Sequence, residues 1–373
     1  MNLDCFSVEK LLCYYPVVKD AIVNGNYDQI FPLHITLDFT THCNLRCWWC
    51  NSKVVPNSLN PDVAASIPRD LHAWHNKMKY AGVITPGICI AGGEPTLYPG
   101  FSNVVGQLNE NFNVGVITNG TKSFADKIPS LTDCVFVGVS VDAATEESYS
   151  RNKEGGKNWS FNVVLDNIQN LTDYVRSRKC KMNCGIKGYG VAFKFLVTPY
   201  NVGEMFDACR LADKLGCHVF QARPYDSEPG RCDTPIDVEE YRRQQALIEA
   251  LKTKMLVKVM DHNFDPITLN KQQSEHCHVS CFWLRISPGS VGGLQYGLCV
   301  DRLGFEPLII ARDISITEFA DTVWGKEAHL NTVKRFNDLK LYETCPRCSR
   351  YTFNEMVTNY LVREPNELLP AMI

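Results

Sequence analysis

Short apolar runs alternate with stretches of helical periodicity between residues 33 and 260 of the chain. Short apolar runs bounded by turn residues are typical of buried strands, and apolar positions spaced three and four apart are typical of helices. The predicted strands are Leu33–Phe39, Gly87–Ala91, Val114–Ile117, Cys134–Val141, Gly190–Val197, His218–Ala222 and, as a possible last one, Met255–Met260. The predicted helices are Leu71–Ala81, Phe101–Asn111, Lys122–Ile128, Asn162–Arg176, Val202–Leu215 and Asp237–Thr253. This alternation predicts right-handed β/α units and a parallel sheet.

The number of units sets the fold class, which we predict to be α/β. About six units are too few for a closed eight-unit barrel of about 250 residues, so we expect an open, partial (β/α)6 barrel over residues 32–262. Residues 1–31 precede it as a helical lead-in, with helices expected over Val8–Tyr15 and Val17–Val23. The alternation stops after residue 262, and residues 263–373 are expected to form a small C-terminal domain.

Composition narrows the class of protein. The 373 residues are 45% apolar and 21% charged, as in an ordinary globular protein. The net charge is −3 without a dense run of Lys and Arg, which disfavours nucleic acid as the main partner. No apolar run reaches the roughly 18 residues that cross a bilayer, and Met1–Lys10 lacks signal-peptide features, so we expect a cytoplasmic protein without a membrane partner. Its 17 cysteines are many for a compartment where disulfides are rare, so grouped thiols indicate metal sites.

The first cysteine group directly follows the first predicted strand. It has the spacing Cys43-x3-Cys47-x2-Cys50. Three closely spaced thiolates can hold three irons of a 4Fe-4S cluster and leave the fourth iron open to bind a ligand. A zinc knuckle is the alternative, with His42 as the fourth ligand that structural zinc requires.

This group and three later motifs resemble the radical S-adenosylmethionine (radical SAM) superfamily. An aromatic residue, Trp49, precedes the last cysteine, and a Gly92-Gly93-Glu94 sequence follows the second strand. Thr118-Asn119-Gly120 ends the third strand, and Ser140-Val141-Asp142 ends the fourth. Each motif lies at the C-terminal end of a strand, where β/α folds build their sites. The resemblance covers about residues 33–225.

The resemblance implies cofactors and residue roles. Cys43, Cys47 and Cys50 would ligate the cluster, whose open iron would bind S-adenosylmethionine (AdoMet). The implied AdoMet contacts are Trp49 near the adenine, Gly92, Gly93 and Glu94 at the methionine moiety, Ser140 at the ribose, Val197 and Asn201 at the adenine, and Asn119 and Asp142 at the same strand ends. Arg151 would bind the AdoMet carboxylate or lie in solvent, and Trp48 would pack in its loop. An external electron donor of flavodoxin or ferredoxin type would reduce the cluster. The reduced cluster would cleave AdoMet, and the resulting 5′-deoxyadenosyl radical would abstract a hydrogen atom from the substrate.

The second cysteine group lies in the C-terminal region. Cys281 and Cys299 flank a glycine-containing, hairpin-like segment, and Cys345 and Cys348 form a Cys-x2-Cys turn. This pattern resembles the twitch form of the SPASM domain, which carries one auxiliary 4Fe-4S cluster. The four cysteines would be its ligands, with Cys277 as a spare or alternative thiol. A structural zinc site built from the same four residues is the other interpretation.

A cluster with four thiolates has no open iron, so it would act as an electron acceptor. We therefore expect dehydrogenation, oxidation or rearrangement of a sugar-like or nucleoside-like small molecule. The roughly 30 residues before the first strand are too few for a peptide-recognition domain. A peptide-modifying maturase is the first alternative, and a non-catalytic iron–sulfur or zinc protein is the second.

The end of the sixth predicted strand supplies the candidate substrate contacts. Gln221, Arg223, Tyr225 and Asp226 should point into the cavity. Arg223 could clamp a carboxylate or phosphate, or pair with Asp226. Tyr225 could relay an electron or a proton, or simply pack. Asp261 and His262 could supply a general base, or form a surface turn.

Overall fold

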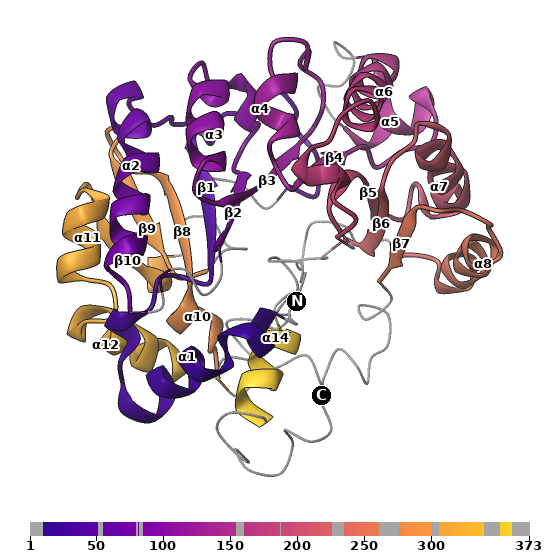
Figure 1. The fold of residues 1–373 in the computed structure, drawn as a ribbon. Helices are drawn as coiled ribbons and strands as arrows, with labels where there is room; N and C mark the ends of the chain where they lie inside the picture. Colours follow the sequence, from indigo (N-terminus) through magenta and orange to yellow (C-terminus); the bar gives the residue numbers. More distant parts are fainter. Residues whose placement is uncertain are drawn as a thin grey trace.

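The strands form one ten-stranded sheet with the order β10-β9-β8-β1-β2-β3-β4-β5-β6-β7 (Figure 1). The computed structural model describes residues 10–50, 55–79, 81, 85–153, 160–186, 188–225, 235–260, 276–299, 306–338 and 351–359, without the side chains of 10–14 and 351–352. The strands are β1 His34–Asp38, β2 Gly87–Ala91, β3 Asn113–Thr118, β4 Phe136–Ser140, β5 Gly190–Val197, β6 Val219–Pro224, β7 Leu256–Val259, β8 Trp283–Pro288, β9 Leu294–Gly297 and β10 Ile309–Arg312. Strands β1 to β7 are parallel in sequence order, β8 is parallel to β1, and β9 and β10 continue as antiparallel neighbours.

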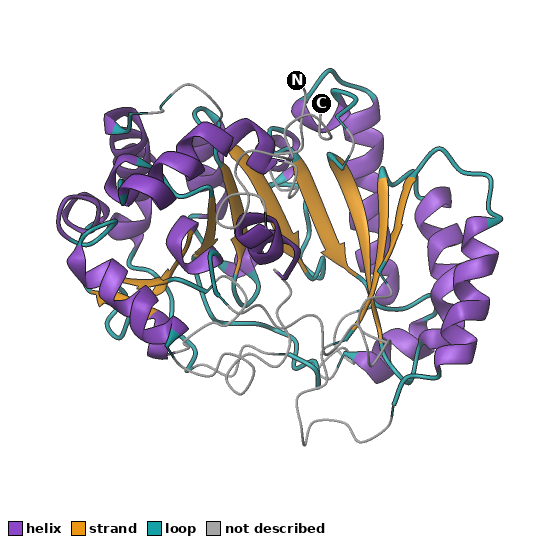
Figure 2. Ribbon diagram, turned by 90° about the horizontal axis from the view of Figure 1, so that it is seen from below, coloured by secondary structure: helices purple, strands orange, loops and turns teal. Residues whose placement is uncertain are grey.

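Helices cover the outer face of this curved sheet (Figures 1 and 2). The helices of the barrel region are α2 Pro61–Lys77, α3 Phe101–Asn109, α4 Ile128–Thr132, α5 Glu146–Asn152, α6 Phe161–Arg176, α7 Met205–Lys214 and α8 Val238–Glu249. The other helices are α1 Lys10–Asn24, α10 Val279–Phe282, α11 Ile316–Thr322, α12 Glu327–Asn337 and α14 Tyr351–Met356. No helix within the described ranges is long and apolar enough to cross a membrane.

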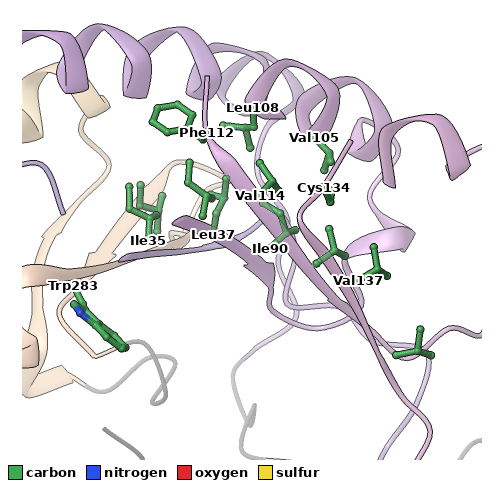
Figure 3. Packing of buried hydrophobic residues seen from close by; sticks show 14 of the residues in the cluster. Ile35, Leu37, Ile90, Val105, Leu108, Phe112, Val114, Cys134, Val137 and Trp283 are labelled. Carbon is green, nitrogen blue, oxygen red and sulfur yellow. The ribbon is translucent and has the colours of Figure 1, made fainter. Parts of the chain in front are cut away.

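Alternation along the strands separates a hydrophobic outer face from a more polar inner face. Ile35 and Leu37 are fully buried, and Figure 3 shows them on the side of the sheet where α2 and α3 pack. Figure 3 places Trp283 of β8 on the opposite face. Side chains alternate with a period of two in a strand, so Asp38 shares the inner face with Trp283, whose register partner is His34. The helices therefore bury the apolar core, and the inner face is left for the site.

The predicted β/α order of the barrel is confirmed, and the possible last strand over Met255–Met260 is present as β7. The helix predicted over Lys122–Ile128 is wrong, because α4 begins only at Ile128. Pro129 lacks an N–H and fits the first turn of a helix better than its end. Helix α5 was not predicted. Its start is a capping box in which Thr145 and Ser148 bond each other's backbone N–H groups.

The C-terminal region adds strands to the barrel sheet. The expected hairpin between Cys281 and Cys299 is present as β8 and β9, but the sequence did not predict that β8 would pair with β1. The domain boundary at residue 262 stays a prediction, because residues 261–275 lie outside the described part of the chain. The N-terminal helices predicted on either side of Pro16 form one helix, α1, with Pro16 inside it.

Candidate functional site

The three cysteines of the first group lie on one loop after β1. Cys43 and Cys50 are exposed and Cys47 is partly buried. The backbone N–H of Cys50 donates to the carbonyl oxygen of Cys47 at 3.0 Å, which curls the end of the loop. Burial raises the pKa of the Cys47 thiol to about 12, with Lys153 acting in the opposite direction and the neighbouring charges of Cys43 and Cys50 adding to the increase. The three sulfurs are therefore close enough to interact electrostatically.

The backbone of the Gly-Gly-Glu motif holds this loop. The N–H of Gly93 donates to the oxygen of Thr40 at 2.9 Å, and the N–H of Glu94 donates to the oxygen of His42 at 2.8 Å. A Cβ on Gly93 would lie 2.1 Å from the oxygen of His42, and Gly92 has a φ of +108°. A larger residue at either position would push the cysteine loop away.

The carboxylate of Glu94 is fully buried and already bonded. One oxygen accepts from the hydroxyls of Thr96 and Thr118, and the other accepts from the N–H of Asn119 at 2.7 Å. Burial raises the pKa of Glu94, against these hydrogen bonds. In this arrangement Glu94 joins the end of β2 to the end of β3. The direct contact of its side chain with the methionine moiety stays a prediction.

A buried ammonium group lies between the cysteine loop and the end of β4. Lys153 Nζ is 2.7 Å from a carboxylate oxygen of Asp142 and donates to the carbonyl oxygen of Ser140 at 2.6 Å. It also lies 6.0 Å from the ring centre of Trp49. Burial alone would lower the pKa of Lys153, but the negative charges of Asp142 and Cys47 outweigh it and the pKa is raised. Lys153 is thus a charged group that the sequence analysis missed, since it carries no motif of its own.

Asp142 and Asn201 tie the ends of β4 and β5 together. Asp142 has a φ of +59°, and its second carboxylate oxygen accepts from the N–H of Leu196 at 2.7 Å. Asn201 Nδ2 donates to the carbonyl oxygens of Asp142 and Leu196, each at 2.9 Å. The N–H of Tyr225 donates to the oxygen of Val197 at 2.9 Å. The structure thus brings four predicted residues, Asp142, Val197, Asn201 and Tyr225, to one end of the barrel.

Aromatic side chains cross the same end from the cysteine loop to the ends of β5 and β6. The ring centre of Trp48 lies 5.1 Å from Trp49, 5.7 Å from Tyr200 and 5.3 Å from Tyr225, all edge-on. The guanidinium of Arg151 lies over the Tyr200 ring at 4.6 Å. Trp48 therefore packs as predicted, but across the barrel end and not only within its own loop.

The candidate substrate contacts are only partly described. Gln221 accepts a hydrogen bond from Lys194 Nζ at 2.7 Å. Arg223 is exposed on β6, and Tyr225 is buried. Asp226, Asp261 and His262 lie outside the described residues. The predicted catalytic set of Arg223, Tyr225 and Asp226 is therefore not tested as a whole, and those roles stay predictions.

Cys281 of the second cysteine group lies at the end of β1 and β8 opposite to the first group. Cys281 comes two residues before Trp283, which pairs with His34 at the start of β1, whereas Cys43 follows the end of β1. Burial raises the pKa of both Cys277 and Cys281 to about 12, and the charges of Cys299 and Cys281 add to the increase at Cys277. Cys345 and Cys348 lie outside the described residues.

The donor set of the first group fits an iron–sulfur cluster. Three free cysteines lie on one loop, and three thiolates can hold three irons of a 4Fe-4S cluster and leave the fourth iron open. Structural zinc needs a fourth ligand. The assignment of these three cysteines as cluster ligands stays a prediction.

Comparison with known proteins agrees with this geometry. Residues 37–192 match the family model described as the Radical SAM superfamily. The chain is 25% identical over 202 residues to AlbA, the antilisterial bacteriocin subtilosin biosynthesis protein of Bacillus subtilis (strain 168). This alignment covers 53% of this chain and 40% of AlbA. It is 28% identical over 203 residues to the mycofactocin maturase MftC of Mycobacterium ulcerans (strain Agy99), over 52% of this chain and 48% of MftC. The matched parts span less than half of either relative.

A solved structure shares the fold. Streptococcus suis SuiB bound to S-adenosylmethionine superposes with a TM-score of 0.61 at 12% identity, over 84% of this chain and 71% of SuiB. SuiB has also been solved bound to its precursor peptide SuiA, and that structure superposes with a TM-score of 0.58 at 13% identity, over 83% of this chain and 68% of SuiB.

Proposed function

The chain belongs to the radical SAM superfamily, and from that membership we propose that it is a maturase that modifies a peptide. The observation that carries this proposal is the similarity of its sequence to AlbA and MftC, a bacteriocin biosynthesis protein and a maturase. The peptide alternative is thus better supported than the sugar-like or nucleoside-like substrate that we expected first. The shared fold with SuiB, which has been solved with a precursor peptide, is consistent with it.

Cys43, Cys47 and Cys50 would hold the 4Fe-4S cluster of this superfamily. Bound together, the cluster and AdoMet supply the abstraction of a hydrogen atom from an unactivated C–H bond. The chain's own residues would bind AdoMet and the peptide and orient them toward each other. The ammonium of Lys153, beside Cys47 and over Trp49, would pair with the carboxylate of AdoMet, a role that we first gave to Arg151.

The inner face of the barrel would hold the peptide. The guanidinium of Arg223 would contact it, and the aromatic rings of Trp48 and Tyr225 would exclude water from the reacting C–H bond. The site built on Cys281 and Cys299 with Cys345 and Cys348 would hold an auxiliary cluster that accepts the electron released when the substrate is oxidised. An external donor of flavodoxin or ferredoxin type would supply the electron that starts the reaction.

The experiment that tests this proposal uses the anaerobically reconstituted full chain with AdoMet, dithionite and synthetic peptides encoded beside its gene. We expect 5′-deoxyadenosine to form and one of the peptides to lose two hydrogens, as measured by mass spectrometry. A Cys47→Ala variant should lose both products, whereas Cys184→Ser, which alters an exposed thiol outside both cysteine groups, should retain them. Formation of 5′-deoxyadenosine together with turnover of a sugar or nucleoside, and with every peptide unchanged, would restore the small-molecule interpretation.

A further inference from the structure

Asn119 contacts a sulfur of the first cysteine group through its side chain. It directly follows β3 and is 8% exposed. Its Nδ2 lies 3.8 Å from Cys43 Sγ and donates to Oδ1 of Asn44 at 3.0 Å. The backbone N–H of Leu45 donates to the same sulfur at 3.4 Å. Cys43 thus receives one side-chain donor and one backbone donor.

The orientation of this amide is fixed from both sides. Its oxygen accepts from the N–H and the hydroxyl of Thr121, at 3.0 and 2.7 Å. A backbone N–H can only donate, so the oxygen must face Thr121 and the NH2 group must face Cys43. The N–H of Asn119 is itself held by the buried carboxylate of Glu94 at 2.7 Å. The donor is therefore aimed at the sulfur before any cofactor binds.

We propose that Asn119 is a positioning residue that raises the reduction potential of the AdoMet-binding cluster through an N–H···S hydrogen bond to Cys43. Hydrogen bonds to cluster sulfurs are among the factors that set these potentials, because they stabilise the reduced state, which carries one more negative charge. Glu94 acts one step further back, by fixing the backbone from which the amide projects. This inference rests on Cys43 as a cluster ligand and does not depend on which substrate is modified.

The variants separate the donor from the packing around it. Asn119→Asp keeps the shape and the acceptor for Thr121, but it replaces the N–H donor with an oxygen. Asn119→Leu removes the donor without adding a charge. Thr121→Val is the matched control, since it removes the hydroxyl bonds to Asn119 and Asn44 and leaves the donor to Cys43 in place.

The measurement is a redox titration of the reconstituted full chain followed by electron paramagnetic resonance. The AdoMet-binding cluster is identified as the signal that changes when AdoMet is added. In both Asn119 variants we expect a more negative midpoint potential, with a roughly tenfold lower ratio of reduced to oxidised cluster at a fixed potential, which is about 59 mV for one electron. Thr121→Val should titrate like the wild type, and iron content should be the same in all four proteins.

Three results would overturn the inference. One is an unchanged midpoint in both Asn119 variants. Another is an equal shift in Thr121→Val, which would assign the effect to packing of the loop. The third is loss of iron from both Asn119 variants, which would make the amide necessary for holding the cluster and not for tuning it. A peptide that stays unmodified would count against the proposed function alone, and a wild type that binds no cluster would overturn the cofactor assignment itself.

Discussion

Arg285 on β8 donates two hydrogen bonds to a single carboxylate oxygen of Asp38 on β1, from Nε and Nη2, each at 2.7 Å. Asp38 is completely buried and Arg285 is 8% exposed. The pair lies on the inner face of the sheet, at the end of the strand that leads into the cysteine loop. It therefore links the C-terminal hairpin to the strand that positions the first cysteine group.

Replacing Arg285 should destabilise the protein strongly. Arg285→Met keeps the length of the side chain but leaves the Asp38 carboxylate buried without its cation. Removal of one partner of a buried pair typically costs about 3–5 kcal/mol. We expect a loss of that size in the free energy of unfolding, measured by urea denaturation of the reduced apoprotein.

The double variant Asp38→Leu/Arg285→Met is the control for this prediction. It removes both charges, and replacement of a buried pair by apolar residues is often neutral or stabilising. It should recover most of the lost stability. Equal destabilisation in the single and double variants would show that packing, and not the buried charge, determines the effect.

The glycines under the cysteine loop give a second prediction. A methyl group on Gly93 would lie 2.1 Å from the oxygen of His42, so Gly93→Ala should displace the loop. We expect the reconstituted variant to lose the about four irons of one 4Fe-4S cluster, as measured by iron and sulfide analysis.

Gly106→Ala is the matched control for this substitution. Gly106 lies inside α3, and its added methyl group would meet no atom within 4 Å. Alanine is favoured over glycine in a helix by about 0.5–1 kcal/mol, so this variant should keep its iron and gain slightly in stability. Full iron content in Gly93→Ala would contradict the role given to the close approach.

The sequence predicted those parts of the fold and of the site that depend on neighbouring residues. Buried parallel strands are short apolar runs, so the β/α order could be read directly, and the cysteine and glycine motifs are local patterns. The contacts of Asp38 with Arg285 join residues 247 positions apart. They exist only because β8 pairs with β1, and no local pattern predicts that pairing.

The side-chain contacts of Lys153 and Glu94 could not be predicted from the sequence either. The buried ammonium of Lys153 pairs with Asp142, a residue whose backbone is left-handed, and no local sequence pattern predicts that pair. The sequence showed that Glu94 follows the second strand, but it did not show the hydrogen bonds of Glu94 to Thr118 and Asn119 at the end of β3. A motif gives the position of a residue in the chain, and the partners of its side chain depend on the packing of other loops.

The two cysteine groups should be separable by iron analysis. The anaerobically reconstituted wild type should hold about eight irons per chain, as expected for two 4Fe-4S clusters. The Cys345→Ala/Cys348→Ala variant should hold about four. Four irons and one zinc in the wild type, with the zinc lost in the variant, would identify the second site as structural and remove the electron-acceptor role.

The environment of His329 predicts how stability changes with pH. His329 is completely buried in α12. Its Nδ1 accepts from the N–H of Gly325 at 3.0 Å, and its Nε2 lies 2.9 Å from the oxygen of Ser280. The ring is therefore neutral, with its proton on Nε2. Burial lowers its pKa from 6.5 to about 4, against the hydrogen bond to Ser280, so the imidazole is harder to protonate in the folded chain than in the unfolded chain.

A lowered folded-state pKa means that the unfolded chain binds more protons between pH 6.5 and about 4, so the free energy of unfolding should decrease as pH falls through this window. One histidine contributes at most about 1.4 kcal/mol per pH unit. His278, whose pKa burial also lowers to about 4, should add a similar slope. Urea denaturation of the reduced apoprotein at several pH values would measure this slope.

The variant His329→Gln is the control. It keeps a donor for Ser280 but cannot titrate, so it should lose the slope of one proton and keep that of His278. An unchanged slope in this variant would show that His329 is not the titrating group, because a neutral glutamine binds no proton in either state.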